Sequence, residues 1–231
     1  MKYRISVVIP IYNEEQNINK SLNKLVPLLE KKFPDYEIVL VESGSTDNSA
    51  SIADNAAKNN RRIKVIHQRK RLGYGNAIRT GLEKCSLDVC IYSDCDLPYD
   101  FKNIVEATKY IGNYDAVIGY KLGKRESIGR YILSFGGKAF ARIFFGIKVK
   151  DVGFPFKLMR TKLVKRFRLV SDTNFIPVEI LLELKKNRAK IKEMPIQYRM
   201  RKIGNSKVIS YFSIIKDYLA DVAKYMKKKI E

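Results

Sequence analysis

The sequence predicts an α/β domain with a mostly parallel sheet and helices on both faces. Short β-branched or apolar runs recur through the first half of the chain, and stretches with apolar residues at helical spacing separate them. This alternation is typical of βαβ units, whose crossover helices cover both faces of a parallel sheet. The 231 residues, of which 45% are hydrophobic, are enough to bury the core of such a domain.

Five segments have the composition of strands. They are Ile5–Pro10, Tyr36–Val41, Ile63–His67, Val89–Ser93 and Ala116–Gly119. Between the first two, apolar residues recur at helical spacing at Ile18, Leu22, Leu25 and Leu29. A further helix is expected to start after a cap at Asp47 or Asn48 and to run toward Asn59. Ligands of parallel sheets bind beyond the carboxyl ends of the strands, so the residues that follow each run are the candidates for a site.

Charge and cysteine content restrict the environment and the partners. The formal net charge is +21, and residues 121–168 alone carry 14 basic and 2 acidic side chains. Such a surface attracts phosphates, whether of nucleic acid, of anionic lipid or of a small substrate. Cys85, Cys90 and Cys95 fit neither a zinc spacing nor an even disulfide framework, which favours a reduced, cytosolic compartment. No uncharged apolar stretch approaches the ~20 residues of a membrane-spanning helix.

Polar motifs follow the first four predicted strands. In chain order they are "PIYNEE", "VESGSTDNS", "QRKRLGYGNAIRTG" and "SDCDLPYD". The second is compatible with a plain loop and helix cap or with a ligand site. The third resembles a phosphate-binding loop, although it lacks the third glycine of GxGxxG and the GK[ST] ending of a P-loop.

The fourth motif places two carboxylates on one side of a strand end. Asp94 and Asp96, two residues apart in extended chain, repel each other unless a cation or a proton intervenes. Mg²⁺ and Mn²⁺ are commonly held by one or two carboxylates together with a substrate diphosphate. We therefore expect a divalent cation here, and a solvated acidic turn is the alternative.

Together, these motifs resemble the inverting GT-A glycosyltransferases of family 2. Two later segments, "DVGFPFKLMRT" and "EMPIQYRMRKIGNSKV", are similar to segments of the dolichyl-phosphate mannose synthases and dolichyl-phosphate glucosyltransferases. The resemblance covers nearly the whole chain. It implies a GT-A nucleotide-sugar-binding domain over residues 1–207, which transfers mannose from GDP-mannose or glucose from UDP-glucose to a polyprenyl phosphate such as dolichyl phosphate.

The resemblance also implies roles for individual residues. The donor site would comprise Pro10, Tyr12, Glu14, Glu42, Gly73, Asp94, Lys121, Arg201, Ser206 and Lys207. The catalytic residues would be Asp94, Asp96, Arg201 and Lys207. Asp96 and Asp94 would hold Mg²⁺ or Mn²⁺, and Arg130 and Ser134 would bind the acceptor phosphate. Pro98 stands where the mannose synthases have a polar ligand, so Tyr99, Asp100 or a water would complete the metal shell.

Two segments have the pattern of amphipathic helices. In the first, about residues 127–145, the apolar positions are Ile128, Tyr131, Ile132, Phe135, Ala139, Ile143 and Phe144. Arg130, Ser134, Lys138 and Arg142 recur every four residues on another face. This helix could dock on the core or lie in a lipid headgroup layer. The second segment, residues 208–231, is expected to form a C-terminal membrane-associating helix, so that the protein attaches peripherally to the cytoplasmic face of the membrane. Its apolar side would comprise Tyr211, Phe212, Ile215, Leu219, Val222 and Met226.

Two other functions remain as alternatives. One is a family 2 transferase that acts on a sugar hydroxyl of a surface polysaccharide or glycolipid. The other is a basic nucleic-acid-binding protein, but no recognised binding motif is present and the basic positions alternate with a broad apolar face. No nucleic acid partner is therefore expected. His67, the only histidine, is assigned no role.

Overall fold

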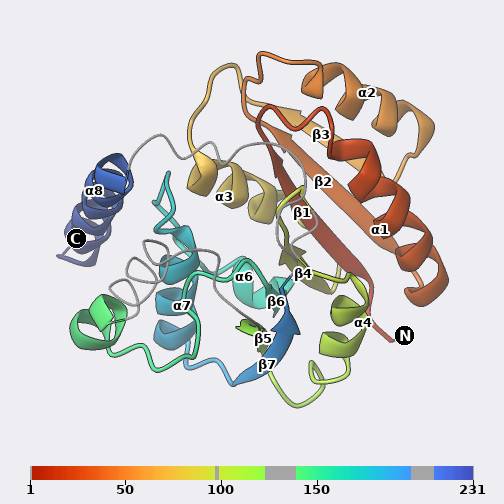
Figure 1. Ribbon diagram of the computed structural model, residues 1–231. Helices are drawn as coiled ribbons and strands as arrows, with labels where there is room; N and C mark the ends of the chain where they lie inside the picture. Colours follow the sequence, from red (N-terminus) through yellow and green to blue (C-terminus); the bar gives the residue numbers. More distant parts are fainter. Residues whose placement is uncertain (1, 97–98, 123–138, 199–210, 231) are drawn as a thin grey trace.

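The computed structural model describes residues 2–96, 99–122, 139–198 and 211–230 (Figure 1). The strands are β1 (Ile5–Ile11), β2 (Tyr36–Glu42), β3 (Ile63–His67), β4 (Val89–Tyr92), β5 (Ala116–Leu122), β6 (Lys157–Arg160) and β7 (Ile191–Gln197). The helices are α1 (Ile18–Lys32), α2 (Ser49–Asn59), α3 (Tyr74–Lys84), α4 (Lys102–Thr108), α6 (Thr161–Val164), α7 (Ile176–Lys186) and α8 (Tyr211–Ile230). Residues 139–145 are also helical.

The described strands form one sheet in the order β3-β2-β1-β4-β6-β5-β7. Of these strands, β6 alone runs antiparallel to its neighbours β4 and β5, which confirms the expectation of a mostly parallel sheet. The first four strands are adjacent in this order, so the four motifs that follow them gather along one stretch of the sheet edge. Register supports this arrangement, because Glu42 at the end of β2 lies opposite Ile11 at the end of β1.

Helices cover both faces of the sheet, as expected (Figure 1). Side chains of a strand alternate between the faces. In β1, Val7 and Ile9 therefore belong to the core beneath α1, α2 and α4, while Val8 belongs to the core beneath α3 and α7. Strands buried on both sides in this way need nearly continuous apolar runs, and β1, β2 and β4 supply them, with Ser6, Glu37 and Glu42 as buried polar exceptions.

Helix α2 begins and ends where the sequence predicts. It starts at Ser49, after Asn48 in the capping position, and it ends at Asn59. The carboxylate of Asp47 contributes to this start, because its Oδ1 accepts the backbone N–H of Ser49 at 2.9 Å. Such a bond satisfies one of the amide groups that have no partner within the first turn of a helix.

Strands β6 and β7 were not expected from the apolar pattern. The four residues of β6 include a fully buried lysine, Lys157, which interrupts the apolar composition on which the prediction relied. The second, β7, lies at the edge of the sheet and contains Pro195, which an edge strand tolerates because it has fewer ladder hydrogen bonds to lose. Both segments form strands because they pair with strands that are distant in sequence, which is a tertiary effect.

The C-terminal helix α8 is docked on the body of the molecule. Tyr218, Val222 and Tyr225 pack against the core that contains α7, and Asp221 is fully buried. Of the apolar side predicted for this helix, Val222 is thus packed, whereas Leu219 and Met226 are 53% and 44% exposed. A helix could present one apolar side to the core and another to solvent, and the sequence pattern alone does not separate the two.

Only the end of the first amphipathic segment lies within the described residues. Phe140 contacts Tyr218 of α8 and Phe145 contacts Tyr225, each pair with ring centroids 6.0 Å apart. All four residues belong to helical stretches, one at 139–145 and the other in α8. The described end of the first predicted amphipathic segment therefore packs against α8.

Candidate active site

A cavity of about 220 Å³ lies where the ends of β1, β2 and β4 meet the start of α3. Its lining residues are Pro10, Ile11, Tyr12, Glu14, Ser43, Arg71, Gly73, Tyr74, Ala77, Asp94, Cys95 and Asp96. Six residues predicted for the donor and metal sites are among them: Pro10, Tyr12, Glu14, Gly73, Asp94 and Asp96. The structure thus brings together residues that are up to 86 positions apart, from 10 to 96.

Two of the three carboxylates of the fourth motif face this cavity. Asp94 and Asp96 closely follow β4, and both are partly buried. The hydroxyl of Tyr74 donates a hydrogen bond to Asp94 Oδ1 at 2.8 Å. Burial, and next the neighbouring Asp94 carboxylate, raise the pKa of Tyr74 well above its ordinary value, so this phenol stays protonated and remains a donor. Asp94 is therefore fixed in position from one side.

The loop after β1 is braced by the loop after β2. Asn13 has a positive φ of 52°, which asparagine tolerates better than most residues, and its N–H donates to Ser45 Oγ at 3.0 Å. The next residue, Glu14, donates its backbone N–H to Ser49 Oγ at 2.8 Å. The "SGSTDNS" motif is thus used to hold Tyr12 and Glu14 at the cavity.

Arg71, Ser43 and Tyr74 line the cavity although the sequence did not single them out. The guanidinium of Arg71 lies 4.3 Å from the centroid of the Tyr12 ring. A cation held over an aromatic face at a cavity rim suits an anionic group such as a diphosphate. The basic run "QRKR" ahead of Gly73 was the available signal, but nothing in the sequence tells which of its cations turns toward the site.

A distant loop takes up two backbone amides at the start of α3. The backbone N–H of Gly75 donates to the carbonyl oxygen of Asp172 at 3.0 Å, and the N–H of Asn76 donates to the same oxygen at 3.4 Å. Two of the amides that an anion would use at a helix N-terminus are thus already bonded within the protein. A Cβ on Gly73 would lie 2.1 Å from that carbonyl oxygen, so the glycine is needed for close packing of backbone on backbone.

Glu42 is buried and does not line the cavity. Its Oε1 accepts the backbone N–H of Ser45 at 2.5 Å, and its Oε2 lies 3.2 Å from His67 Nδ1. His67 also contacts Asp54, with 2.9 Å from Nε2 to Oδ1. The hydrogen bond to Asp54, and next that to Glu42, raise the pKa of His67 above its ordinary value. His67 therefore has two acidic partners, and Glu42 shapes the turn after β2.

Lys121 is likewise not among the cavity-lining residues. Its Nζ lies 3.7 Å from the centroid of the Tyr198 ring, just beyond the end of β7. The other predicted residues of the second half of the chain fall outside the described residues. They are Arg130, Ser134, Arg201, Ser206 and Lys207.

Pro98 also falls outside the described residues, but the two side chains considered as its substitutes do not. Tyr99 is buried against Phe156, with ring centroids 5.0 Å apart. Asp100 Oδ1 accepts the N–H of Lys102 at the start of α4. Neither Tyr99 nor Asp100 lines the cavity.

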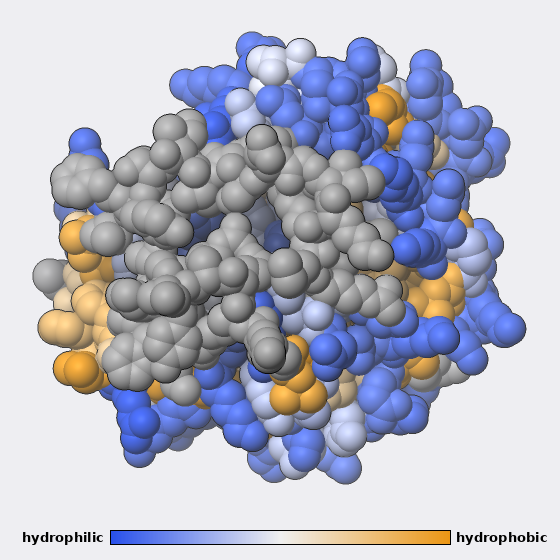
Figure 2. All heavy atoms as spheres, in the orientation of Figure 1, coloured by the Kyte–Doolittle hydropathy of each residue, from blue (hydrophilic) through white to orange (hydrophobic). Residues whose placement is uncertain are grey.

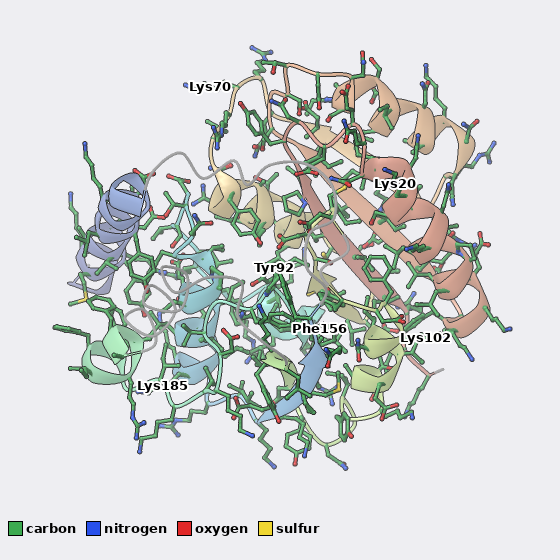
Figure 3. All side chains as sticks on the ribbon, viewed as in Figure 1. Lys20, Lys70, Tyr92, Lys102, Phe156 and Lys185 are labelled. Carbon is green, nitrogen blue, oxygen red and sulfur yellow. The ribbon has the colours of Figure 1, made fainter. Side chains whose placement is uncertain are left out.

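A buried lysine lies behind the carboxylates. Lys157 of β6 is 0% exposed and donates from Nζ to the carbonyl of Phe154 at 2.8 Å. Its Nζ lies 5.9 Å from the ring centroid of Tyr92, the last residue of β4. Figure 3 shows Tyr92 near the middle of the molecule, whereas Lys185 lies toward its lower left edge.

This burial changes the acidity of the Lys157 ammonium. Burial lowers the pKa of Lys157 to about 7, although Asp151 and Asp94 act in the opposite direction. An ammonium removed from water loses its hydration, so the neutral amine becomes easier to reach. The lysine side chain behind the site therefore titrates near neutral pH.

In the described part of the chain, the candidate ligands for a divalent cation are the carboxylates of Asp94 and Asp96. Among the described residues no group of three or more His, Cys, Asp or Glu side chains could hold a metal ion. Asp94 and Asp96 nevertheless fit Mg²⁺ or Mn²⁺, since these cations are often bound through one or two carboxylates, with waters and substrate phosphates completing the shell. The residues present suit a cation that arrives with a diphosphate.

The arrangement of the sheet and the position of the cavity define a GT-A glycosyltransferase domain. A solved structure of glucosyl-3-phosphoglycerate synthase from Mycobacterium tuberculosis, with Mn²⁺, UDP-glucose and phosphoglyceric acid, shares this fold at a TM-score of 0.74 and 18% identity, over 96% of this chain and 79% of that one. The same synthase has also been solved with Mg²⁺ and UDP. Residues 6–168 match the model of glycosyl transferase family 2, and the chain belongs to this family.

Relatives of the chain include two enzymes named for polyprenyl phosphates. Dolichol-phosphate mannosyltransferase of Pyrococcus furiosus is 30% identical over 97% of this chain and 64% of its own length. Undecaprenyl-phosphate 4-deoxy-4-formamido-L-arabinose transferase of Pseudomonas fluorescens is 28% identical over 75% of this chain and 52% of its own length. The chain thus spans between half and two thirds of these relatives.

Apolar side chains are exposed where α8 meets residues 139–145. Ile143 and Phe144 are 76% and 69% exposed, and Leu219 and Met226 of α8 add to them. Figure 2 shows hydrophobic surface on this side of an otherwise largely hydrophilic molecule. Within the described ranges, none of the helices is both long enough and apolar enough to span a bilayer.

Proposed function

We propose that the chain transfers a hexose from a nucleotide diphosphate sugar to a polyprenyl phosphate. The observation that carries this proposal is the pair Asp94 and Asp96, which faces a cavity rimmed by Arg71 and Tyr12 at the strand ends. Membership of glycosyl transferase family 2 supports a sugar donor. The names of the Pyrococcus and Pseudomonas relatives support a polyprenyl phosphate acceptor.

The transfer we propose inverts the anomeric carbon in one displacement. A phosphate oxygen of the acceptor attacks C1 of the sugar while the bond from C1 to the donor diphosphate breaks, and the leaving diphosphate takes the electron pair. Mg²⁺ or Mn²⁺, held by Asp94 and Asp96, would stabilise the negative charge that grows on this diphosphate. Arg71 would add a cation at the rim, and Tyr74 would keep Asp94 in position.

A phosphate acceptor also removes the need for a general base. A sugar hydroxyl has to lose a proton as it attacks and calls for such a base, whereas a phosphate monoester is already anionic near neutral pH. Such an acceptor needs cations that orient it. By resemblance we assign this task to Arg130 and Ser134, with Arg201, Ser206 and Lys207 closing over the donor.

We further propose that the surface formed by Ile143, Phe144, Leu219 and Met226 contacts the membrane in which a polyprenyl phosphate resides, on its cytoplasmic face. Exposed basic residues accompany these apolar residues in the same two segments, namely Arg142, Lys216 and Lys227. Apolar side chains among cations suit a layer of anionic headgroups. Nucleic acid, the alternative partner for a basic surface, would leave these apolar side chains without a role.

Two measurements test the proposed function. Calorimetric titration with GDP-mannose and with UDP-glucose, each with and without Mn²⁺, should show Mn²⁺-dependent binding of one donor in preference to the other. With that donor, a short polyprenyl phosphate should accept sugar, while the matching polyprenol should not. Equal transfer to the polyprenol or to a free sugar would contradict a phosphate acceptor and favour a polysaccharide or glycolipid acceptor instead.

A further inference from the structure

The cavity wall contributed by α3 is held by a loop from the other half of the chain. Residues 171–173 lie between α6 and α7, and the carbonyl oxygen of Asp172 accepts the N–H groups of Gly75 and Asn76. Its side chain adds two contacts to α3, because Oδ1 accepts Asn76 Nδ2 at 2.9 Å and the guanidinium of Arg79 at 3.2 Å. The residues of this wall that line the cavity are Gly73, Tyr74 and Ala77. They directly precede and follow Gly75 and Asn76 in the sequence.

One buried carboxylate of α8 fixes this loop in turn. Asp221 Oδ2 accepts the backbone N–H of Asp172 at 3.0 Å, the N–H of Thr173 at 2.8 Å and the hydroxyl of Thr173 at 2.8 Å. The side chain of Asp221 is 1% exposed. A carboxylate that accepts three hydrogen bonds in a buried position is a strong and directional constraint.

The same contacts continue from α3 to the far wall of the cavity. Asn76 Oδ1 accepts Gln68 Nε2 at 2.9 Å, and Gln68 Oε1 accepts the hydroxyl of Ser43 at 2.5 Å. Gln68 and Ser43 are both buried, and Ser43 lines the cavity. A continuous series of hydrogen bonds thus leads from Asp221, which does not line the cavity, to residues on two of its sides.

We infer that Asp221 is a positioning residue for the nucleotide site. By holding the backbone of Asp172 and Thr173, it fixes the carbonyl that caps α3, and so places Tyr74 for its hydrogen bond to Asp94. This inference rests on the proposed function, since it takes the cavity to be the donor site. It makes α8 a part of the donor site's support, in contrast to the expectation of an appended membrane-associating helix.

The test compares Asp221→Ala with Asp217→Ala, which truncates an exposed carboxylate of the same helix. Affinities for UDP and for GDP are measured by calorimetry with Mn²⁺ on the 231-residue chain. We expect Asp221→Ala to weaken binding of the preferred nucleotide about tenfold, as for loss of one strong buried contact, and Asp217→Ala to leave it unchanged. Amide hydrogen exchange should quicken at Gly75 and Asn76 in Asp221→Ala but stay slow in the last turn of α3.

A purely structural loss would lower thermal stability without changing the affinity of the folded protein. Asp221→Asn, which keeps one side-chain oxygen as an acceptor, should give intermediate effects, and it serves as the test variant if the alanine variant does not fold. Wild-type affinity in a folded Asp221 variant would overturn the inference alone. A wild-type protein that binds neither UDP nor GDP would overturn the proposed function and the inference together.

Discussion

The two halves of this molecule contribute to the cavity in different ways. Within the described part of the chain, the first half supplies every lining residue, from Pro10 to Asp96, at or shortly after the ends of β1, β2, β3 and β4. The second half instead supplies support, because its loop at residues 171–173 caps α3 and its helix α8 fixes that loop. The chemistry of the site is therefore local to the strand ends, whereas its geometry depends on groups far away in sequence, as between Gly75 and Asp172.

The largest effect is expected in the first half, at Asp96. Asp96→Ala removes one of two carboxylates at the proposed cation site and should lower sugar transfer by at least about a hundredfold. Mn²⁺ should then no longer tighten donor binding, which calorimetry would detect. Asp217→Asn, which neutralises an exposed carboxylate of α8, is the control. Undiminished transfer in Asp96→Ala would contradict the assignment of the chemistry to the first half.

A smaller but still large effect is expected where the two halves meet. A Cβ on Gly75 would lie 2.6 Å from the carbonyl oxygen of Thr173. Gly75→Ala should therefore reduce the free energy of unfolding by about 2 kcal/mol, because either α3 or the backbone of residues 171–173 has to move to make room for the methyl group. Gly153→Ala is the matched control, since its Cβ would meet nothing within 4 Å. Urea denaturation of both variants would show whether the contact is as tight as the distances require.

The next prediction concerns Lys157, a residue of the second half that packs behind Asp94 and Asp96. Its pKa of about 7 in the folded protein lies below the 10.5 of an ordinary lysine. From pH 7 upward the unfolded chain thus retains a proton that the folded protein gives up, so stability rises with pH. Relative to Lys157→Met, the wild-type protein should gain about 2 kcal/mol of unfolding free energy between pH 7 and pH 9.

The control for this titration is Lys102→Met at the exposed start of α4 (Figure 3). Its free energy of unfolding at the same pH values gives the background against which the Lys157→Met difference is compared. Chemical denaturation at pH 7, 8 and 9 suffices for both pairs. A pH-independent difference for Lys157→Met would mean that this lysine stays charged inside the protein.

The smallest effect is expected on the outer surface of the second half. Phe144→Ser should weaken binding to anionic liposomes about fivefold, since part of one aromatic side chain no longer enters the headgroup layer. Donor affinity should not change, because Phe144 is 69% exposed and is not among the cavity-lining residues. Leu72→Ser, at an exposed apolar residue beside the cavity, should leave liposome sedimentation unaltered. Sedimentation that is indifferent to Phe144 would place the membrane contact elsewhere.

The sheet of the first half and the position of the site follow from local patterns along the chain. Short apolar runs between amphipathic helices favour strands that are buried on both faces, and the adjacent ends of parallel strands bring Tyr12, Glu14, Asp94 and Asp96 together. These are consequences of periodicity and of chain direction, both of which can be read locally. Family resemblance added roles for residues in the second half, of which Lys121 is not among the cavity-lining residues.

What the polar and glycine-rich motifs do depends on packing between distant parts of the chain. The "GYG" motif resembles a phosphate loop in sequence, but Gly73 and Gly75 are needed for the close approach of residues 171–173. Glu42 contacts Ser45 and His67, and Asp221 of α8 accepts the backbone N–H of Thr173. A buried polar group must find a hydrogen-bond partner, and that partner can come from any part of the chain. Pairing of this kind depends on distances in space, which spacing along the sequence does not contain.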